Sequence, residues 1–554
     1  MSQNQRLILA MVLSILIMSL WQKYYIIPRM PQKQVVKESV QVLKNHQESH
    51  VIEDRDDLIY KTKAERLKFS NDEISGSINL RGAKLDDLIL KKYHKTIKDD
   101  SDPVTLLSPS TTAEPYFITV GWVSKDRDII LPDSNTLWTS NSLNLSSESQ
   151  ATLHWTSPQG IRFMIKFAID DDYMFTVEQS ISNNYSSAVN ISPYATISRG
   201  VNGQKSENVV VHQGAIAVSD GKLHEITFDD LIKEGKADFQ KGANWLGFSD
   251  KYWLSALISE DSNLDAKFSS YVVHGNHRVQ ADLLYATRSV DVGSSNSSSI
   301  KIFAGAKNLD VLEGYETKYN LPMFDHAVDF GILYFITKPI FLLLHMFYDY
   351  IGNFGVAILL LTVFIKMLLF PIAYKGYVGM NKLRDLQPKM SELKERYKDD
   401  AQAFQKALVD LYKREKVNPA AGCLPILMQM PVFFALYKVL YVTIEMRHAP
   451  FFGWIQDLSA PDPTSIFNLF GLISWSPPAF LMIGVFPILM SITMYIQQKL
   501  NPEPTDPVQA KMMKMLPFIF LFMFSSFPSG MVIYWAWSNL LSIIQQVVIK
   551  KITS

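Results

Sequence analysis

The chain of 554 residues contains a single cysteine, Cys423, so no disulfide can form within it. Neither sign of charge is in excess, because 54 lysines and arginines balance 54 aspartates and glutamates. This balance gives no indication of a polyanionic partner, and no DNA is expected to bind. The sequence also lacks a phosphate-binding glycine loop, a metal-spaced cluster of histidines or cysteines, and a nucleophile elbow. We therefore expect no catalytic residue, metal or cofactor, and a protein that is not an enzyme.

Charged and apolar residues are unevenly distributed along the chain. Residues 30 to 320 are charged and rich in serine, threonine and asparagine, whereas residues 330 to 550 contain long apolar runs broken by one charged block. This contrast predicts a multi-domain membrane protein in which a soluble domain is joined to a membrane domain.

The N-terminal residues 1–27 are predicted to form a transmembrane anchor. The stretch from Leu7 to Trp21 is almost purely apolar. A cleaved signal peptide is the alternative, but the following residues are large and offer no small-x-small cleavage site. Residues 28–65 are polar with little periodicity and are interpreted as a linker.

Residues 66–323 are predicted to form a large antiparallel β-sandwich. Short alternating runs are separated by clusters of aspartate, asparagine, serine and glycine, as is typical of antiparallel sheets. The clearest alternating apolar residues are Leu153, Trp155, Phe163, Ile165, Phe167, Ile169, Tyr173, Phe175 and Val177. Helical spacing from Asn308 to Tyr319 predicts a helix that closes this domain.

Residues 324–351 are apolar but interrupted by charges and a proline, which predicts a kinked amphipathic helix in the membrane interface. Residues 352–550 are predicted to form a five-span core, including a helical hairpin at residues 375–421. Each candidate span is near the ~20 residues that cross a hydrocarbon layer. The spans are Gly352–Tyr374, Gly422–Val442, Pro478–Lys499, Lys511–Phe527 and Pro528–Ile549.

The distribution of basic residues predicts the orientation. The loop at residues 375–421 is dense in lysine and arginine, whereas the loop from Thr443 to Pro477 has only Arg447. By the positive-inside rule, the first loop and both termini are cytoplasmic, and the β-sandwich lies on the outer side.

Lys366 is the most informative polar residue of the spans. It lies about eight residues from the cytoplasmic end, a depth of ~12 Å, where a charge normally faces protein or a water-filled cavity. Thr362 is one turn earlier on the same helix face. The alternative is a lysine that snorkels to the cytoplasmic headgroups.

Other polar residues of the spans have two interpretations as well. Gln429 can line a cavity or form an ordinary hydrogen bond between helices. Tyr534 and Trp535 fall inside the last span, where they can face a wet groove or simply pack. The hairpin is either a solvated element or a docking site for an acidic partner through its basic residues Lys382, Arg384, Lys389, Lys394 and Arg396.

Four stretches resemble signatures of the YidC family of membrane protein insertases. These are KREKVNPAAGCLPILMQMPVFFALY at 413–437, LQPKM at 386–390, WIQDLSAPDP at 454–463 and FPSGMVIY at 527–534. The resemblance extends to the whole architecture: N-terminal anchor, periplasmic β-sandwich, interfacial helix and five-helix core.

This resemblance implies a non-enzymatic insertase and chaperone of the Gram-negative inner membrane, working alone or with the Sec translocon. Its groove would be open to the cytoplasm and to lipid, with Lys366 as the positive residue and Thr362, Gln429, Tyr534 and Trp535 lining it. A client's hydrophobic segment would slide along a surface that includes Met430, Pro431 and Phe433. The implied partners are nascent membrane proteins, the Sec translocon with its accessory subunits, membrane lipids, and a ribosome or signal-recognition receptor at the cytoplasmic loops.

The chain departs from the family pattern at two of these positions. Lys366 stands where the family usually has arginine, and lysine lacks the planar guanidinium fork. Trp535 stands where tyrosine is typical. The family's β-sandwich resembles sugar mutarotases without implying their activity.

Three other functions remain open from the residues alone. A secondary transporter would be expected to show inverted repeats, and none is evident. A ligand-sensing membrane receptor would use the β-sandwich as its sensor. A carbohydrate enzyme would need a site built from the scattered residues His212, His224, His274 and His277.

Overall fold

The computed structural model describes residues 52–553, except 99, 202–210, 240, 260–263, 399, 419–423, 474, 476, 479–480 and 502–506. The predicted anchor at residues 1–27, most of the predicted linker and Cys423 therefore lie outside the described residues.

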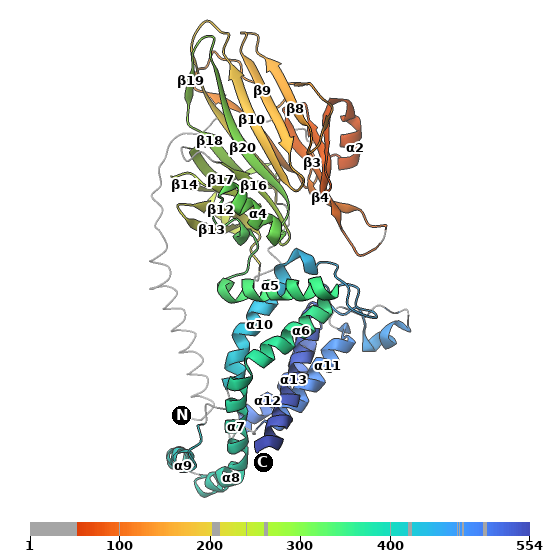
Figure 1. Cartoon of the computed structure of the whole chain (residues 1–554), viewed down its shortest axis with the longest axis vertical. Helices are drawn as coiled ribbons and strands as arrows, with labels where there is room; N and C mark the ends of the chain where they lie inside the picture. Colours follow the sequence, from red (N-terminus) through yellow and green to blue (C-terminus); the bar gives the residue numbers. More distant parts are fainter. Residues whose placement is uncertain are drawn as a thin grey trace. The chain divides into compact units, whose positions relative to one another are not determined.

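The first part of the described chain folds into two sheets that form a sandwich (Figure 1). Neighbouring strands pair antiparallel, apart from the short parallel pair β1–β7. In spatial order the first sheet contains β14 (Lys236–Phe239), β17 (Leu264–Val273), β18 (Asn276–Tyr285), β11 (Val189–Gly200), β5 (Tyr116–Ser124), β3 (Lys84–His94), β2 (Ile74–Asn79), β1 (Arg66–Ser70) and β7 (Asn144–Leu145), with β19 (Arg288–Val290) beside β11 and β4 (Pro103–Leu107) beside β3. The second contains β13 (Lys222–Thr227), β12 (Gly214–Ser219), β15 (Trp245–Ser249), β16 (Trp253–Ile258), β20 (Ser295–Ala306), β10 (Met174–Ser182), β9 (Arg162–Ile169), β8 (Gln150–Thr156) and β6 (Thr139–Ser140).

Alternation in the sequence determines which side of each strand is buried. In β9 the residues Phe163, Ile165, Phe167 and Ile169 are all buried, and the residues between them are not. In the antiparallel register with β10, Phe167 lies opposite Val177, so both contribute to the same face. The predicted antiparallel β-sandwich is confirmed.

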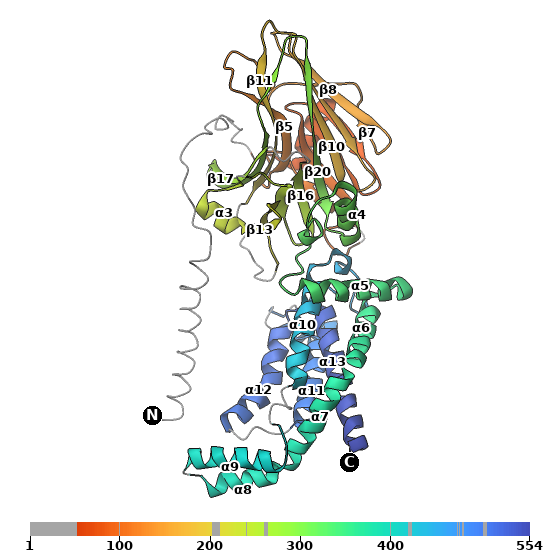
Figure 2. The same cartoon turned by 60° about the vertical axis from the view of Figure 1, so that its left-hand side comes forward.

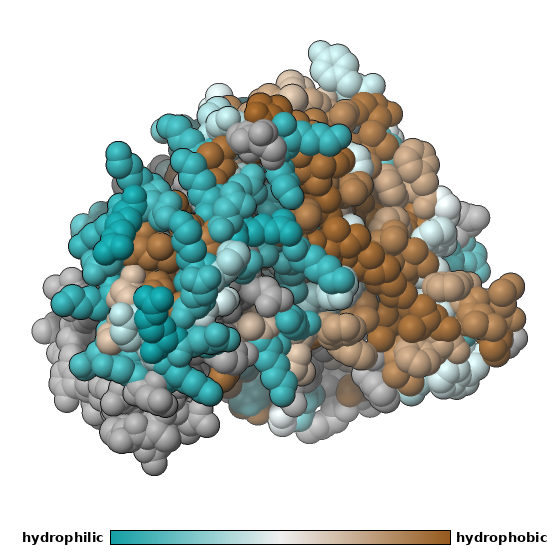
Figure 3. Space-filling view, turned by 90° about the horizontal axis from the view of Figure 1, so that it is seen from below, coloured by the Kyte–Doolittle hydropathy of each residue, from teal (hydrophilic) through white to brown (hydrophobic). Residues whose placement is uncertain are grey.

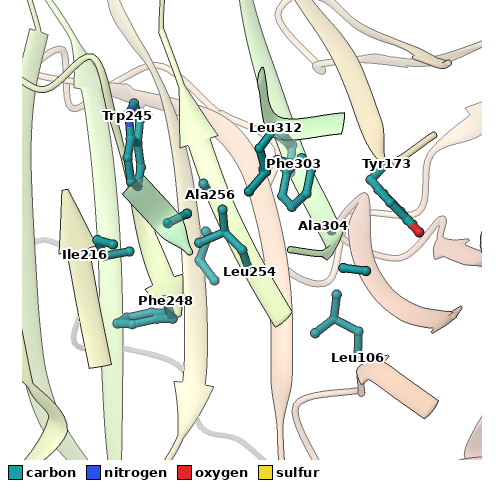
Figure 4. Close-up of a cluster of buried hydrophobic side chains, with 14 of the residues drawn as sticks. Leu106, Tyr173, Ile216, Trp245, Phe248, Leu254, Ala256, Phe303, Ala304 and Leu312 are labelled. Atoms are coloured by element: carbon teal, nitrogen blue, oxygen red, sulfur yellow. The ribbon is translucent and has the colours of Figure 1, made fainter. Parts of the chain in front are cut away.

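Large aromatic and aliphatic side chains fill the sandwich (Figure 4). Phe303 of β20 has no exposed surface and makes edge-on contacts with the rings of Tyr173, Tyr315 and Phe324. Tyr315 belongs to α4 (Leu309–Tyr319), whose N-cap is Asn308 and whose buried face is Leu309, Leu312 and Tyr315. The predicted closing helix is therefore present and packs on the sandwich core.

The described C-terminal part is helical, and α8 and α9 lie side by side (Figure 2). Its helices are α5 (Tyr334–Ile351), α6 (Phe354–Leu368), α7 (Phe370–Asp385), α8 (Gln387–Arg396), α9 (Ala401–Arg414), α10 (Leu424–Val442), α11 (Val485–Leu500), α12 (Pro507–Phe524) and α13 (Ser529–Thr553). Short 3₁₀ turns occur at η4 (Asp325–Ala327), η6 (Ile444–Met446) and η7 (Ile466–Gly471), and α3 (Phe228–Glu234) belongs to the sandwich.

Two predicted boundaries differ from the structure. The end of the predicted linker is helical, with α2 (Arg55–Lys61) followed by η3 (Lys63–Glu65), because Asp54 caps the helix by accepting from the backbone N–H groups of Asp56 and Asp57. The predicted interfacial helix begins at Tyr334 rather than Phe324.

The residues that precede α5 form only the short turn η4, and their carboxylates contact α5 and α10. Lys338 of α5 donates to the carboxylate of Asp325 at 2.7 Å, and Tyr334 also donates to it. Burial alone would raise the pKa of Asp325, but these hydrogen bonds outweigh it and hold the pKa below its ordinary value. Asp329 accepts from Lys438 of α10 at 2.8 Å, which ties the start of this region to the helical core.

The first predicted span, Gly352–Tyr374, is broken. The chain bends by 68° between α6 and α7 at Leu369. Pro371 lies at the start of α7, and a proline has no N–H to continue the hydrogen-bond ladder from α6. This bend was not predicted because Pro371 lies in a run that is mostly apolar.

Length and hydropathy therefore single out fewer spanning helices than predicted. Within the described ranges, one helix segment, Ser529–Ile552, is long and apolar enough to cross a membrane, or two if the bent pair α6–α7 counts as one span. The segment Gln429–Val442 is apolar but shorter. The structure places apolar helices at all five predicted positions, but α11 begins seven residues after Pro478.

Candidate client groove

The helix α6 is fixed at its start by one side chain and one close contact. The Asn353 side chain accepts from the N–H of Val356 and donates to the carbonyl of Phe451, at 3.1 Å each. At Gly355 a Cβ atom would lie 2.0 Å from the Phe451 ring, so only glycine allows this approach. These contacts set where the helix begins, and thereby where Lys366 lies near its other end.

The Lys366 ammonium contacts side chains from two other helices. Its Nζ donates to Ser542 Oγ of α13 at 2.8 Å and to Gln429 Oε1 of α10 at 3.2 Å. Gln429 in turn donates from Nε2 to the hydroxyl of Tyr534 at 2.6 Å. Residues from α6, α10 and α13 therefore form one hydrogen-bonded cluster, which we call the Lys366 cluster: Lys366, Gln429, Tyr534 and Ser542.

All protein partners of this cation are neutral. Among the described residues no ion pair joins Lys366 to a carboxylate. A partly buried cation with only neutral partners remains attractive to an anionic group that enters its surroundings. The charge of the Lys366 cluster is therefore of the sign that attracts a carboxylate.

Ser542 was missed in the sequence. It lies two helical turns after Tyr534, with Ser538 midway, and all three side chains are buried. The Ser542 hydroxyl donates to the Ser538 carbonyl at 2.9 Å, which directs an oxygen lone pair to Lys366. The i, i+4, i+8 spacing of these polar residues was a detectable signal of a polar stripe on the last span.

Polar contacts continue along α13. Trp537 donates to the carbonyl of Leu359 at 3.2 Å, Gln545 reaches the carbonyl of Lys366 at 3.4 Å, and Gln546 reaches Asn501 at 3.1 Å. Hydrogen bonds of this kind hold helices together where water is absent. They position α13 against α6 and α11 and so support the Lys366 cluster.

Two predicted groove residues make other contacts. Thr362 is buried, and its hydroxyl donates to the Ile358 carbonyl of its own helix at 2.6 Å. Trp535 packs against Phe433, Phe520 and Phe524, with ring centroids 4.6 to 5.7 Å apart. The structure brings neither into a hydrogen bond with the Lys366 cluster.

The predicted sliding surface is partly accessible. Met430 is 45% exposed and Pro431 is exposed, whereas Phe433 is half-buried against Trp535. Exposed apolar side chains also cover α12, including Phe518, Ile519 and Phe522. Figure 3 shows a broad hydrophobic region beside a hydrophilic one on the face seen from below.

The basic residues of the predicted hairpin at residues 375–421 lie on α7 and α8. Lys382, Lys389, Lys394 and Arg396 are exposed, and Arg384 is half-buried. Lys389 forms an ion pair with Glu415 at 2.6 Å, and Leu383, Leu386, Met390 and Val417 form a small apolar core between the helices. The helices of the predicted hairpin thus pack on one another and have a basic surface.

The structure offers no alternative metal site in its described residues, where no group of three histidine, cysteine, aspartate or glutamate side chains could hold an ion. The histidines considered for a carbohydrate site are dispersed. His212 hydrogen-bonds the Ala215 carbonyl, and His224 of β13 packs against Phe239 of β14 in the other sheet. His274 lies at the turn between β17 and β18, and His277 lies in β18.

Comparison with known proteins identifies relatives of both parts. Residues 346–554 match the family model described as "60Kd inner membrane protein", and residues 66–343 match "YidC periplasmic domain". A protein named membrane protein insertase YidC from Rickettsia felis is 45% identical, with 98% of each chain covered. A protein of the same name from Rickettsia bellii is 46% identical over 99% of this chain and 98% of that protein.

Solved structures are less similar. A crystal structure of an active YidC insertase covers 87% of this chain and 92% of its own at 16% identity, with a TM-score of 0.35. A galactose mutarotase-like protein from Lactobacillus casei covers 43% of this chain and 99% of its own at 11% identity, with a TM-score of 0.31. Scores this low carry no argument about function.

Proposed function

Because the chain belongs to the YidC family of membrane protein insertases, we propose that its helical core inserts clients through a polar groove centred on the Lys366 cluster. The clients are nascent integral membrane proteins. The observation that carries this proposal is the partly buried Lys366 cation, which has only neutral hydrogen-bond partners from α10 and α13.

In this mechanism the Lys366 ammonium draws in an acidic or polar segment of the client. Taking such a segment into hydrocarbon costs several kcal/mol for each unsatisfied polar group. A groove that supplies a cation, an amide and hydroxyl groups lowers this cost for part of the path. The client's apolar segment leaves along the exposed apolar side chains, among them Met430 and Pro431, because lipid solvates it there.

Lysine at this position gives a specific character to the groove. Its ammonium donates to Gln429 and Ser542 in different directions, so it acts as a point charge rather than as a two-pronged clamp. We infer that the groove recognises the charge of a client's acidic residue without requiring a bidentate geometry. Replacing Lys366 with arginine should therefore reduce client insertion only slightly.

The proposed topology follows from charge. The helices α6, α10, α11, α12 and α13 lie in the inner membrane. The basic end of α7, the helices α8 and α9 and both termini are cytoplasmic, and the sandwich is periplasmic. The bend at Leu369 leaves α6 with fifteen residues, ~22 Å of helix against a hydrocarbon layer of ~30 Å. The groove therefore lies where the first span is short, and the polar path across it is short as well.

The basic surface of α7 and α8 fits a negatively charged partner at the cytoplasmic side. A ribosome or a signal-recognition receptor is the proposed partner there, and the Sec translocon with its accessory subunits is a proposed partner within the membrane. Exposed apolar side chains on α12 and α13 fit membrane lipids.

Site-specific crosslinking tests the groove. A photoreactive residue is placed at Lys366, Gln429 or Tyr534, and a stalled nascent membrane protein is supplied. Each position is expected to crosslink the client, whereas an equivalent probe at exposed Tyr60 of α2 is not. Crosslinks that are absent at all three groove positions, with the variants still folded, would contradict the proposal.

A further inference from the structure

A polar cavity lies away from the Lys366 cluster. It has a volume of about 590 Å³ and lies between the turn that follows β3 and the segment that follows α10. Sites for small ligands have volumes of roughly 300–1,000 Å³, so this cavity can hold a ligand the size of a lipid headgroup. Its lining includes His94 at the end of β3, Lys98 from the turn, and Arg447 and His448 from the segment.

The cations at this cavity are held by the fold. Arg447 donates from Nη2 to the carbonyls of His94 and Lys95, at 2.6 and 3.5 Å, and lies 5.6 Å from the Trp253 ring. A guanidinium has five N–H groups, so one nitrogen can anchor the side chain while others face a ligand. Lys98 is exposed at the same cavity, whereas the charge of nearby Lys92 is offset by an ion pair with Glu73.

The carboxylate at the cavity does not cancel these charges. Glu445 is mostly buried and accepts from Asn308 Nδ2 at 3.2 Å. Burial raises the pKa of Glu445 from 4.5 to about 7. The carboxyl of Glu445 is therefore partly protonated near neutral pH, and an anion meets less repulsion than it would from a fully charged carboxylate.

Apolar side chains form part of the lining of the cavity. Ile97 at the tip of the turn is 54% exposed and Pro450 also lines the cavity. Two exposed aromatic residues, Phe452 and Trp454, lie on the same segment. Aromatic side chains of this kind anchor at the headgroup level of a membrane. An anion with attached apolar chains fits these surroundings better than a free ion.

We propose that this cavity binds the phosphate of an anionic phospholipid headgroup, with Arg447 and Lys98 as its cationic contacts and the acyl chains beside Ile97, Phe452 and Trp454. The assignment to the outer leaflet rests on the proposed topology, because the segment follows the outer end of α10. The binding itself is independent of the groove.

Titration of the purified full chain in non-ionic detergent with short-chain phosphatidylglycerol tests this, with bound lipid counted by native mass spectrometry. The wild type is expected to bind phosphatidylglycerol saturably and phosphatidylcholine of the same chain length more weakly. Arg447→Gln is expected to weaken binding about 10-fold and Lys98→Gln about 3-fold, because each removes a charge-assisted hydrogen bond.

Lys95→Gln is the matched control. Lys95 neighbours the same turn, but its ammonium lies 3.4 Å from Asp102 and it does not line the cavity. Its binding is expected to equal that of the wild type. Lys98 is exposed and its substitution does not disturb packing, so it keeps the test valid even if Arg447→Gln unfolds.

Three outcomes would overturn the proposal: equal binding by Lys98→Gln and the wild type, equal affinity for phosphatidylglycerol and phosphatidylcholine, or full displacement of the lipid by excess inorganic phosphate. A Lys366→Glu variant that fails in insertion is still expected to bind the lipid like the wild type. Failure of the groove mechanism and failure of this site are thereby distinguished.

Discussion

Two buried arginines of the sandwich and Lys366 of the helical core differ in their partners, and the two regions also differ in the exposure of their large apolar side chains. In the sandwich, buried Arg66 pairs with Asp86 at 2.8 Å and buried Arg199 pairs with Asp250 at 2.8 Å. In the helical core, Lys366 has only neutral partners among the described residues. A charge that is compensated within the fold has a structural role, whereas Lys366, without a counter-charge among the described residues, is the cation that we propose attracts a client.

Apolar side chains show the same contrast. Phe163, Phe175 and Phe303 of the sandwich have no exposed surface, whereas Phe518 and Phe522 of α12 are 60% and 57% exposed. The first arrangement is that of a domain in water, and the second is that of helices in lipid. Single substitutions are therefore expected to lower mainly the stability of the sandwich and mainly the insertion activity of the helical core.

The largest effect on stability is expected from Phe303→Ala. It removes a ring that contacts three other aromatic rings and should lower the free energy of unfolding of the sandwich by about 4 kcal/mol. Denaturant unfolding of the full chain in detergent measures it, with Phe303→Leu as the milder control. Client insertion should be little affected while the protein stays folded, and a loss below about 1 kcal/mol would contradict the packing argument.

Lys366→Glu should reduce insertion of clients with acidic translocated segments on the order of 100-fold, since like charges brought together cost several kcal/mol. Lys366→Arg should be tolerated. Depletion of the native protein and complementation with each variant, followed by a client-insertion assay, measures both. Normal insertion by the Glu variant would remove the basis of the proposed mechanism.

Glu445→Gln should change how stability depends on pH. The pKa of this carboxyl is about 7 in the folded chain and near 4.5 when unfolded, so the folded state binds more protons between these values. The wild type therefore loses stability as pH rises from about 4.5 through 7. Because glutamine never ionises, the variant should gain ~2 kcal/mol at pH 8 and nothing at pH 4.

Melting temperatures of the two full-length proteins across this pH range measure the difference. The glutamine amide oxygen can still accept from Asn308, so the hydrogen bond is retained. If the melting temperatures of the wild type and the variant changed with pH in the same way, the raised pKa of Glu445 would be contradicted.

Ser542→Ala tests whether a hydroxyl partner positions the Lys366 ammonium. Loss of one hydrogen bond to a charged group is worth about 1–2 kcal/mol, so insertion of acidic clients should fall about 5-fold or more, with other clients less affected. Ser542→Thr should restore it. Ser526→Ala, which removes a hydroxyl from the exposed turn before α13, is the matched control.

The smallest effect is expected from deletion of most of residues 60–300. The Lys366 cluster contains no residue of the sandwich, so insertion should stay within about 2-fold of the wild type, a change below 0.5 kcal/mol. The shortened protein must be stably present for the comparison. Loss of insertion under that condition would show that the sandwich takes part in the reaction.

The alternating pattern of Phe163 to Ile169 was enough to predict the sandwich, because side-chain direction in a strand depends only on the parity of the position. Helical spacing similarly located the closing helix at Leu309 to Tyr319. The bend at Leu369 was not predicted, since one proline in an apolar run changes hydropathy little yet interrupts the backbone hydrogen bonds.

The sequence by itself determined that the chain has a polar half and an apolar half, that its basic residues gather in one loop, and that Lys366 lies within an apolar helix. These properties follow from composition and local periodicity. Only the tertiary structure decided which side chains face Lys366. Gln429 and Ser542 are 63 and 176 residues away, and contacts at such separations depend on how α6, α10 and α13 pack. The same packing directs the Thr362 hydroxyl to the Ile358 carbonyl of its own helix and places Trp535 among aromatic rings, although both residues are predicted to line the groove.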